Sequence, residues 1–401
     1  MKEPKIRFKG FQGEWETHAL SEYFKKVCDK NTKMECTIVL TNSAEHGIIP
    51  QNDFFDHAIA NNKNIGGYYI VSPDDFVYNP RVSVTAPVGP INRSLLDFQG
   101  VMSPLYLVFK INTINKDYLN IFYKTNKWHT FMKLEGNCGA RFDRLSISDD
   151  QFVKMPLTHP KDHSEQQSIA SYFQHLDSLI QSTTKKIESL KQVKAASLQS
   201  MFPQEGETTP RVRFKGFEGE WEKVRASNVF KTFNEKNRPD LPVLSATQDR
   251  GMVTRESIGY NIFHDKSNEA TYKHILPGQF IIHLRSFQGG FAHSSIEGIA
   301  SPAYTIMEFK DKTRHFDLYW KYIFVSKEFI KRLELITYGI RDGRSISFEE
   351  FSEMYFTVPS YEEQKKIASY ITTLDRQITL QTQRLEKLKQ IKAACLDNMF
   401  V

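Results

Sequence analysis

The chain contains two copies of one framework. Residues 5–16 read KIRFKGFQGEWE and residues 211–222 read RVRFKGFEGEWE, with nine of twelve positions identical. Residues 165–202 align without a gap with residues 363–400, and 20 of 38 positions are identical. An internal repeat constrains the fold strongly, because one structural unit has to form twice. The stretches between the repeated segments differ, so the sequence predicts one scaffold that carries two dissimilar inserts.

The longer repeated segment has the pattern of a coiled-coil helix. It lacks Gly and Pro in both copies. Its stripe alternates at spacings of four and three, with one polar position in each copy, Thr183 and Gln381; the apolar members are Ile169, Phe173, Leu176, Ile180, Ile187 and Leu190, then Ile367, Ile371, Leu374, Ile378, Leu385 and Leu388. Such a narrow stripe must be buried against another helix. At about 1.5 Å per residue, each segment gives a rod of ~57 Å. We expect the two helices to pair antiparallel, related by a pseudo-two-fold axis, with a globular domain at each end. After Leu190 the stripe shifts to Val193, Leu198 and Met201, so the last turns should pack differently.

The remaining segments predict an α+β protein with two mixed α/β domains. Short β-branched and aromatic runs at 67–71, 105–111 and 279–285 are bounded by Gly, Pro, Asn or Asp, which is typical of strands. A polar, proline-bounded linker separates the two halves. The expected divisions are a first globular domain at 1–163, a first long helix at 164–203, a linker at 204–210, a second globular domain at 211–361 and a second long helix at 362–401.

Composition excludes several protein classes. The 401 residues are 40% apolar and 25% charged, which is an ordinary globular profile. No apolar run reaches the ~18 residues of a membrane span, and no signal peptide is evident, so we expect a cytoplasmic protein without membrane contact. Four cysteines do not make a disulfide framework in a chain of this length. The net charge of +6 permits a nucleic-acid partner without requiring one.

Motifs for catalysis are missing from the sequence. There is no phosphate-binding loop of the form G-x-x-x-x-G-K-[ST] and no zinc-ligand spacing among the cysteines and histidines. The stretch YNPR at 78–81 lacks the second proline and the aromatic residue of an amino-methyltransferase motif. We therefore expect a non-catalytic chain without a cofactor or metal of its own.

Taken together, the repeated motifs resemble the specificity subunit of type I restriction-modification systems over essentially the whole chain. The resemblance rests on three duplicated features: RFKGF-x-GEWE, the Pro-to-Ile-Ala segments at 160–170 and 359–368 that contain Glu-Gln, and the Lys-Ala-Ala helix ends at 194–196 and 392–394. It also includes the pattern RSFQGGF at 285–291 with GIASPAY at 298–304.

The resemblance implies a DNA-recognition role. Each target-recognition domain would read one half of a split, asymmetric sequence in double-stranded DNA, and the paired helices would set the gap. The family's subunit recruits two modification (methyltransferase) subunits and two restriction (translocase and endonuclease) subunits. S-adenosylmethionine, ATP and Mg²⁺ are then expected on those partner subunits. The alternatives are a non-catalytic coiled-coil adaptor that bridges other proteins and, less favoured by the missing motifs, a stand-alone DNA-modifying enzyme.

Candidate contact residues follow from side-chain chemistry, because Arg suits guanine and phosphate while Asn and Gln suit adenine. The DNA-binding candidates are Arg81, Asn92, Arg93, Arg141 and Arg144 in the first domain, and Arg285, Gln288, Arg341 and Arg344 in the second. The four arginines at 141, 144, 341 and 344 recur in both halves, which favours phosphate contact or bracing of the fold over base contact. The partner-binding candidates are Trp15, Trp221, Lys191, Lys194, Lys389 and Lys392, although a buried tryptophan or a solvated lysine is the simpler interpretation.

Overall fold

The chain folds into two compact units. The computed structural model describes residues 3–53, 62–138, 143–204, 206–247, 250–258, 266–283, 290–336 and 346–401. The first unit comprises Met1–Thr184 with Gln383–Val401, and the second comprises Lys185–Thr382. Each unit therefore contains a mixed α/β domain together with a part of both long helices.

The first unit is built around a four-stranded antiparallel sheet in the order β2-β9-β6-β7. These strands span Phe24–Lys26, Leu107–Ile111, Phe76–Tyr78 and Ile91–Arg93. Four two-stranded sheets surround it: β1 (Glu16–Ala19) with β12 (Pro156–His159), β3 (Leu40–Ser43) with β4 (Gly47–Pro50), β5 (Tyr69–Val71) with β8 (Gly100–Met102), and β10 (Asn137–Cys138) with β11 (Leu145–Ser146). The short helices are α1 (Lys116–Phe122), α2 (His129–Glu135) and α3 (Asp149–Phe152), with 3-10 turns at Leu20–Glu22, Gln51–Asp53 and Asn62–Gly67.

The second unit repeats this topology. Its four-stranded sheet has the order β14-β21-β18-β19, over Phe230–Phe233, Thr305–Phe309, Phe280–Ile282 and Phe291–His293. The paired strands are β13 (Glu222–Arg225) with β22 (Tyr355–Val358), β15 (Leu244–Thr247) with β16 (Gly251–Thr254), and β17 (Lys273–Ile275) with β20 (Gly298–Ala300). The short helices are α5 (Ala226–Val229), α6 (Asp317–Phe324), α7 (Lys327–Ile336) and α8 (Phe348–Ser352), with 3-10 turns at Arg255–Ile258 and Lys266–Thr271. The predicted mixed α/β architecture with an internal repeat is confirmed.

Aromatic side chains make up much of both cores. In the first unit Phe76 and Phe109 lie on neighbouring strands with ring centroids 5.7 Å apart, and both are fully buried. In the second unit Phe230 packs edge-on against Trp320 of α6 at 4.9 Å. Such pairs add to the area that aromatic residues bury. The high Phe content of the sequence therefore serves the two cores.

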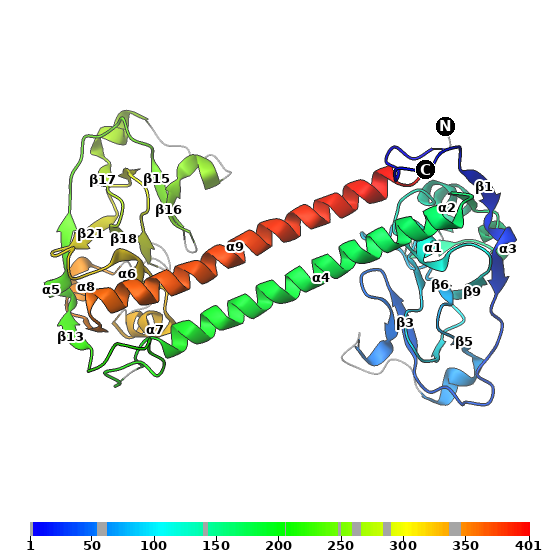
Figure 1. Cartoon of the computed structure of the whole chain (residues 1–401), viewed down its shortest axis with the longest axis horizontal. Helices are drawn as coiled ribbons and strands as arrows, with labels where there is room; N and C mark the ends of the chain where they lie inside the picture. The colour runs from blue at the N-terminus through cyan, green and yellow to red at the C-terminus, as the bar shows by residue number, and fades with distance from the viewer. Residues whose placement is uncertain are drawn as a thin grey trace. The chain divides into compact units, whose positions relative to one another are not determined.

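The two long helices are α4 (His163–Ser200) and α9 (Tyr361–Asn398), green and orange to red in Figure 1. In the first unit the start of α4 lies against the end of α9, where Phe173 packs on Phe400. In the second unit the start of α9 shares a core with the end of α4, and Ile371 clusters there with Met201. The helices therefore run antiparallel in both units, as predicted. Among the described residues no helix is both long and apolar enough to cross a bilayer.

The last turns of α4 leave the 4,3 stripe as predicted, and Leu198 and Met201 pack in the core of the second unit. Val193 is exposed instead of buried, and Ser197 faces inward in its place. The following Met201 and Phe202 are buried in the core of the second unit, beside Trp221. Met399 and Phe400 are likewise buried in the core of the first unit. The Met-Phe pair that ends each long repeat thus packs in the core that is formed mainly by the other half of the sequence.

Candidate nucleic-acid interface

The repeated N-terminal motif holds the first turn of a long helix. Arg7 makes two bonds to the carboxylate of Glu165 at the start of α4, Nε to Oε1 at 2.7 Å and Nη2 to Oε2 at 2.9 Å. Its Nη1 donates to the carbonyl of Gly13 at 2.7 Å. Gly13 has a φ of +85°, a conformation that glycine adopts without strain. The motif therefore folds back on itself and fixes the buried Glu165 in place.

The second copy repeats this clamp on α9. Arg213 bonds the two oxygens of Glu363 at 2.7 and 2.8 Å and the carbonyl of Gly219 at 2.6 Å. The glutamine that follows each glutamate is also buried, and Gln364 accepts from the backbone N–H of Phe316 at 2.9 Å. The duplicated Arg and Glu-Gln residues thus join the motif, the domain and the helix in the same way in both units.

Two of the predicted partner-binding lysines form ion pairs between the long helices. Lys194 of α4 lies 2.5 Å from Asp375 of α9, and Lys392 of α9 lies 2.5 Å from Asp177 of α4. Sequence reasoning missed the two aspartates, although both are identical between the repeats. The other two lysines, Lys191 and Lys389, lie in exposed positions. Lys389 pairs with Glu386 on its own helix at 3.3 Å, and both lysines are exposed, whereas Lys194 and Lys392 help to hold the helices together.

The two motif tryptophans are core residues. Trp15 and Trp221 are 2% and 4% exposed, and each packs edge-on against a tyrosine, at 6.2 Å from Tyr118 and 6.3 Å from Tyr319. A docking surface requires an accessible side chain. The partner-binding role assigned to these two residues is therefore corrected: both anchor the core, and neither can reach another subunit in this conformation.

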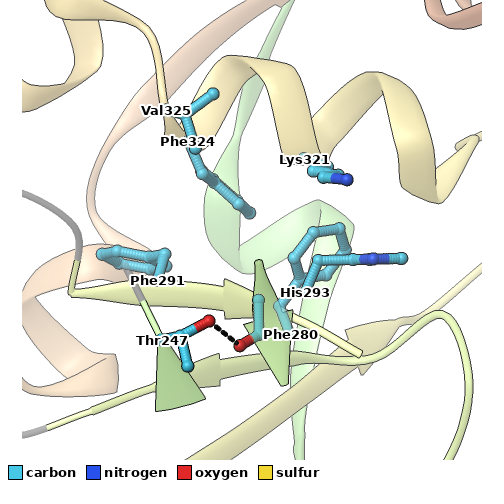
Figure 2. A pocket seen from close by; sticks show the side chains of 8 residues that line it. Thr247, Phe280, Phe291, His293, Lys321, Phe324 and Val325 are labelled. Carbon is cyan, nitrogen blue, oxygen red and sulfur yellow. Dashed lines mark hydrogen bonds between the residues drawn. The ribbon is translucent and has the colours of Figure 1, made fainter. Parts of the chain in front are cut away.

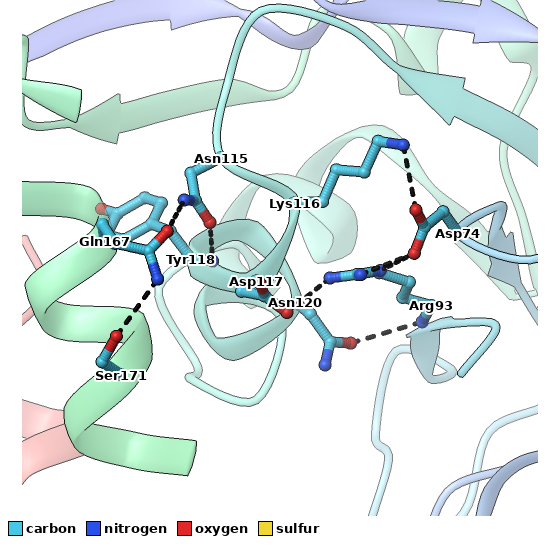
Figure 3. A network of polar contacts seen from close by, with 9 residues as sticks. All are labelled: Asp74, Arg93, Asn115, Lys116, Asp117, Tyr118, Asn120, Gln167 and Ser171. Carbon is cyan, nitrogen blue, oxygen red and sulfur yellow. Dashed lines mark hydrogen bonds and ion pairs between the residues drawn. The ribbon is translucent and has the colours of Figure 1, made fainter. Parts of the chain in front are cut away.

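Arg93 braces the first domain instead of projecting from it. Its guanidinium bonds Asp74 at 2.8 Å and Asp117 of α1 at 2.6 Å, as Figure 3 shows. Burial alone would raise the pKa of Asp74, but the bonds and charges of Arg93 and Lys116 together outweigh it and hold that pKa below its ordinary value. At the corresponding end of β19, His293 bonds Asp317 of α6 at 2.8 Å. Both domains use a side chain at this strand end to hold the first turn of a helix, so the arrangement argues against the predicted DNA contact of Arg93.

Asn92 is enclosed in the same domain. It is 2% exposed, and its amide donates to the side-chain oxygen of Asn42 at 2.6 Å and to the carbonyl of Ser43 at 3.0 Å. Its own side-chain oxygen accepts from the ammonium of Lys124. All the bonds that could read an adenine are used inside the protein. The predicted base contact of Asn92 does not fit this placement.

Arg81 and Arg144, which are far apart in sequence, lie side by side. They are directly opposite each other in an antiparallel bridge, so their side chains point to the same face. The neighbours Val82 and Leu145 pack into the core, which turns both arginines outward to exposed positions. Neither guanidinium has a hydrogen bond or ion pair with any described residue, and the half-buried Asp143 beside them pairs with neither. Two like charges held together without a counterion favour binding of an anion such as DNA phosphate.

The other predicted DNA contacts cannot be placed. Arg141, Arg285, Gln288, Arg341 and Arg344 lie outside the described residues.

A small cavity lies in the second domain between the β15–β16 hairpin and α6. Phe280, Phe291 and Phe324 line it together with His293, as Figure 2 shows. Its volume of about 20 Å³ suffices for roughly one water molecule and is far too small for a cofactor. Within the described ranges no group of three or more His, Cys, Asp or Glu side chains is arranged to hold a metal ion.

The matches found among known proteins concern type I restriction-modification systems. Residues 218–390 match the model of the type I restriction modification DNA specificity domain. The fold resembles the S subunit of a type I restriction-modification system from M. genitalium, with a TM-score of 0.57, 12% identity and coverage of 100% of this chain and 99% of that one. The HsdS subunit from Thermoanaerobacter tengcongensis gives a TM-score of 0.49 and 15% identity, with 96% of each chain covered. No curated protein sequence matches the chain.

Proposed function

We propose that the chain, whose residues 218–390 match the type I restriction modification DNA specificity domain, is the specificity subunit of such a system and binds a bipartite, asymmetric DNA target. The observation that carries this proposal is that matched domain, in a chain whose other half repeats its framework. The clamps of Arg7 on Glu165 and of Arg213 on Glu363 are the same in both halves. Because the two halves share even these individual contacts, we infer that their two domains have the same kind of function.

The two domains should read different half-targets. Their frameworks agree, but the residues between the repeated motifs do not. In the β3–β4 hairpin, for example, the exposed residue before Gly47 is His46, whereas the exposed residue before Gly251 in the β15–β16 hairpin is Arg250. Surfaces with different side chains present different donors, acceptors and apolar groups to base edges. The target is therefore split into two unlike parts.

The gap between the two parts would be set by the paired helices. Each has 38 residues, which corresponds to about 57 Å of α-helix. The reciprocal ion pairs of Lys194 with Asp375 and of Lys392 with Asp177 favour a single register between the helices. A fixed register is what a spacer of defined length needs.

The proposed partners are two modification subunits and two restriction subunits. Equivalent positions on the two long helices expose the same kinds of side chain: Lys191 with Val193 on α4, and Lys389 with Ile391 on α9. Two matching patches suit two copies of one partner. In this proposal the chain itself is non-catalytic and cytoplasmic, while S-adenosylmethionine, ATP and Mg²⁺ bind to the partner subunits.

Selection of binding sites tests the proposal. The full chain, purified together with its modification subunits, should select from a random duplex library one motif of two unlike specific parts separated by unspecified bases. Mapping of methylated adenines in the source genome should give the same motif. A continuous or palindromic motif would contradict the bipartite target. Assembly with the partner subunits without any sequence-specific DNA binding would instead support the adaptor function.

A further inference from the structure

The loop between β6 and β7 is held rigid from within. In residues 79–90, Ser83 and Ala86 exchange two backbone hydrogen bonds at 3.0 and 3.2 Å, and the hydroxyl of Ser83 also accepts from the N–H of Ala86 at 3.1 Å. Closer to the sheet, the hydroxyl of Tyr78 donates to the carbonyl of Val88, whose side chain is fully buried. Gly89 has a φ of +81°, and a Cβ there would collide with the carbonyl oxygen of Asn79. The loop is therefore a compact turn anchored in the core.

This rigid turn presents an apolar side chain to solvent. Val84 lies at its tip, between Ser83 and Thr85, and its side chain is fully exposed. Valine has few rotamers because it is branched at Cβ, so both the backbone and the side chain are fixed before any contact is made. A contact that is organised in advance loses little entropy on binding. Because the Val84 side chain contributes nothing to the core, its position is suited to an external contact.

The charges beside Val84 indicate the kind of partner. Arg81, three residues before it, lies opposite Arg144 in the antiparallel bridge, and Val82 fixes the strand against Asp143 through an N–H to carbonyl bond of 2.9 Å. Both guanidiniums are exposed and have no acidic partner among the residues that the structure describes. An apolar loop tip three residues from Arg81, which has a second unpaired arginine opposite it, suits the major groove of DNA, where phosphates border the base edges.

We propose that Val84 contacts the 5-methyl group of a thymine in the major groove, while Arg81 and Arg144 bind the adjacent phosphates. This inference rests on the proposed DNA-recognition function and assigns one base feature to the first domain. Thymine alone among the four bases presents a methyl group in the major groove, and small apolar side chains read it by contact. The arginines position the domain, whereas Val84 contributes to its specificity.

Replacement of thymine by deoxyuridine isolates this contact, because only the methyl group is lost. A duplex selected by the full chain with its modification subunits is prepared with each thymine replaced singly. At one thymine of one half-target, the wild-type complex should lose about fourfold in affinity, the effect of one buried methyl-sized group. Val84→Ala should bind both duplexes equally and the thymine duplex about as weakly as wild type binds the uracil one. Val212→Ala, which shortens another exposed valine, should keep the fourfold difference.

The outcomes are distinguishable. If Val84→Ala keeps the fourfold discrimination, or if no thymine shows any, the methyl contact is wrong although DNA recognition stands. If Val84→Ala weakens assembly with the modification subunits in the absence of DNA, Val84 contacts protein and the inference is overturned. If the wild-type complex selects no sequence, the proposed function itself fails. Thermal unfolding of Val84→Ala should match that of wild type, because the removed methyl groups are fully exposed.

Discussion

The ammonium of Lys194 lies 2.5 Å from a carboxylate oxygen of Asp375, and this ion pair between α4 and α9 recurs between Lys392 and Asp177. The two pairs are related by the same offset that aligns residues 165–202 with 363–400. Each helix thus contributes one lysine and one aspartate. The repeat in the sequence appears in the structure as a reciprocal contact, which only an antiparallel arrangement of two like helices produces.

Charge exchange should test this reciprocity. Asp177→Lys places two ammoniums opposite each other and should lower the free energy of unfolding by about 1 kcal/mol, because Asp177 and Lys392 are both partly exposed. Lys392→Asp in the same chain should restore most of the loss. Urea denaturation followed by circular dichroism measures both variants. The exposed Lys191 provides the control, and Lys191→Asp should stay within about 0.5 kcal/mol of wild type. Equal losses in the single and double variants would show that the pair does not act across the helices.

The ion pair between Arg7 and the buried Glu165 should contribute more to the free energy of unfolding than the ion pairs between the long helices do. Arg7→Ala leaves the carboxylate of Glu165, which is 2% exposed, without its counterion, so we expect a loss of about 3–5 kcal/mol in the free energy of unfolding. Arg211→Ala serves as the control, because its pair with Glu207 is exposed and should contribute less than about 1 kcal/mol. Similar losses in the two variants would mean that the buried pair is not a fixed part of the core.

Arg81 and Arg144 should control DNA affinity without changing the sequence that is preferred. Removal of one phosphate contact lowers affinity for all duplexes and reduces the salt dependence, d log K/d log[salt], by about 0.9 in magnitude. Arg81→Ala and Arg144→Ala should each show this change in titrations at several salt concentrations. An unchanged salt slope in both variants would exclude phosphate contact.

Asn92 should affect stability and not recognition. Asn92→Ala removes the donor to Asn42 and the acceptor for Lys124, so buried polar groups lose their partners. The expected cost is about 1–3 kcal/mol, seen as a lower melting temperature of the full chain. Below that temperature, the selected DNA motif should be the same as for wild type. A changed base preference would restore the original prediction for this residue.

His315 should make stability depend on pH. Burial, with the nearby charge of Arg314, lowers the pKa of His315 to about 4 from an ordinary value of 6.5. Between these two values the unfolded chain binds more protons than the folded chain, so stability falls as the pH drops from 6.5 towards 4. Allowing for its partial exposure, His315 should account for about 2 kcal/mol over this range. His315→Gln should flatten the dependence, measured by urea denaturation at pH 4.5 and pH 7, while substitution of the exposed His175 should leave it unchanged.

The long helices were predictable because their signal is repeated and periodic. The stripe beginning at Ile169 and its copy beginning at Ile367 identified both elements to within three residues at each end. The burial of Ser197 in place of Val193 was not predictable, because the shift depends on where the Met-Phe ends enter the domains. Because Ser197 is polar, the sequence did not indicate that the buried face of the helix changes there.

The site was predictable only in part, because residue type does not reveal solvent exposure. Arg81 and Arg93 look alike in sequence, yet one is free on the surface and the other is enclosed by Asp74 and Asp117. The difference arises from contacts between segments distant along the chain. Nothing in the sequence singled out Val84. A valine in a loop becomes notable only when the turn around it is shown to be rigid.

The placement of Met399 and Phe400 in the first unit makes the first domain depend on side chains that come more than two hundred residues later in the sequence. Loss of Met399 and Phe400 by a premature stop codon or a protease cut would open a hole beside Phe173 and Tyr118. During synthesis, the core of the first domain therefore stays incomplete until these two residues have been made.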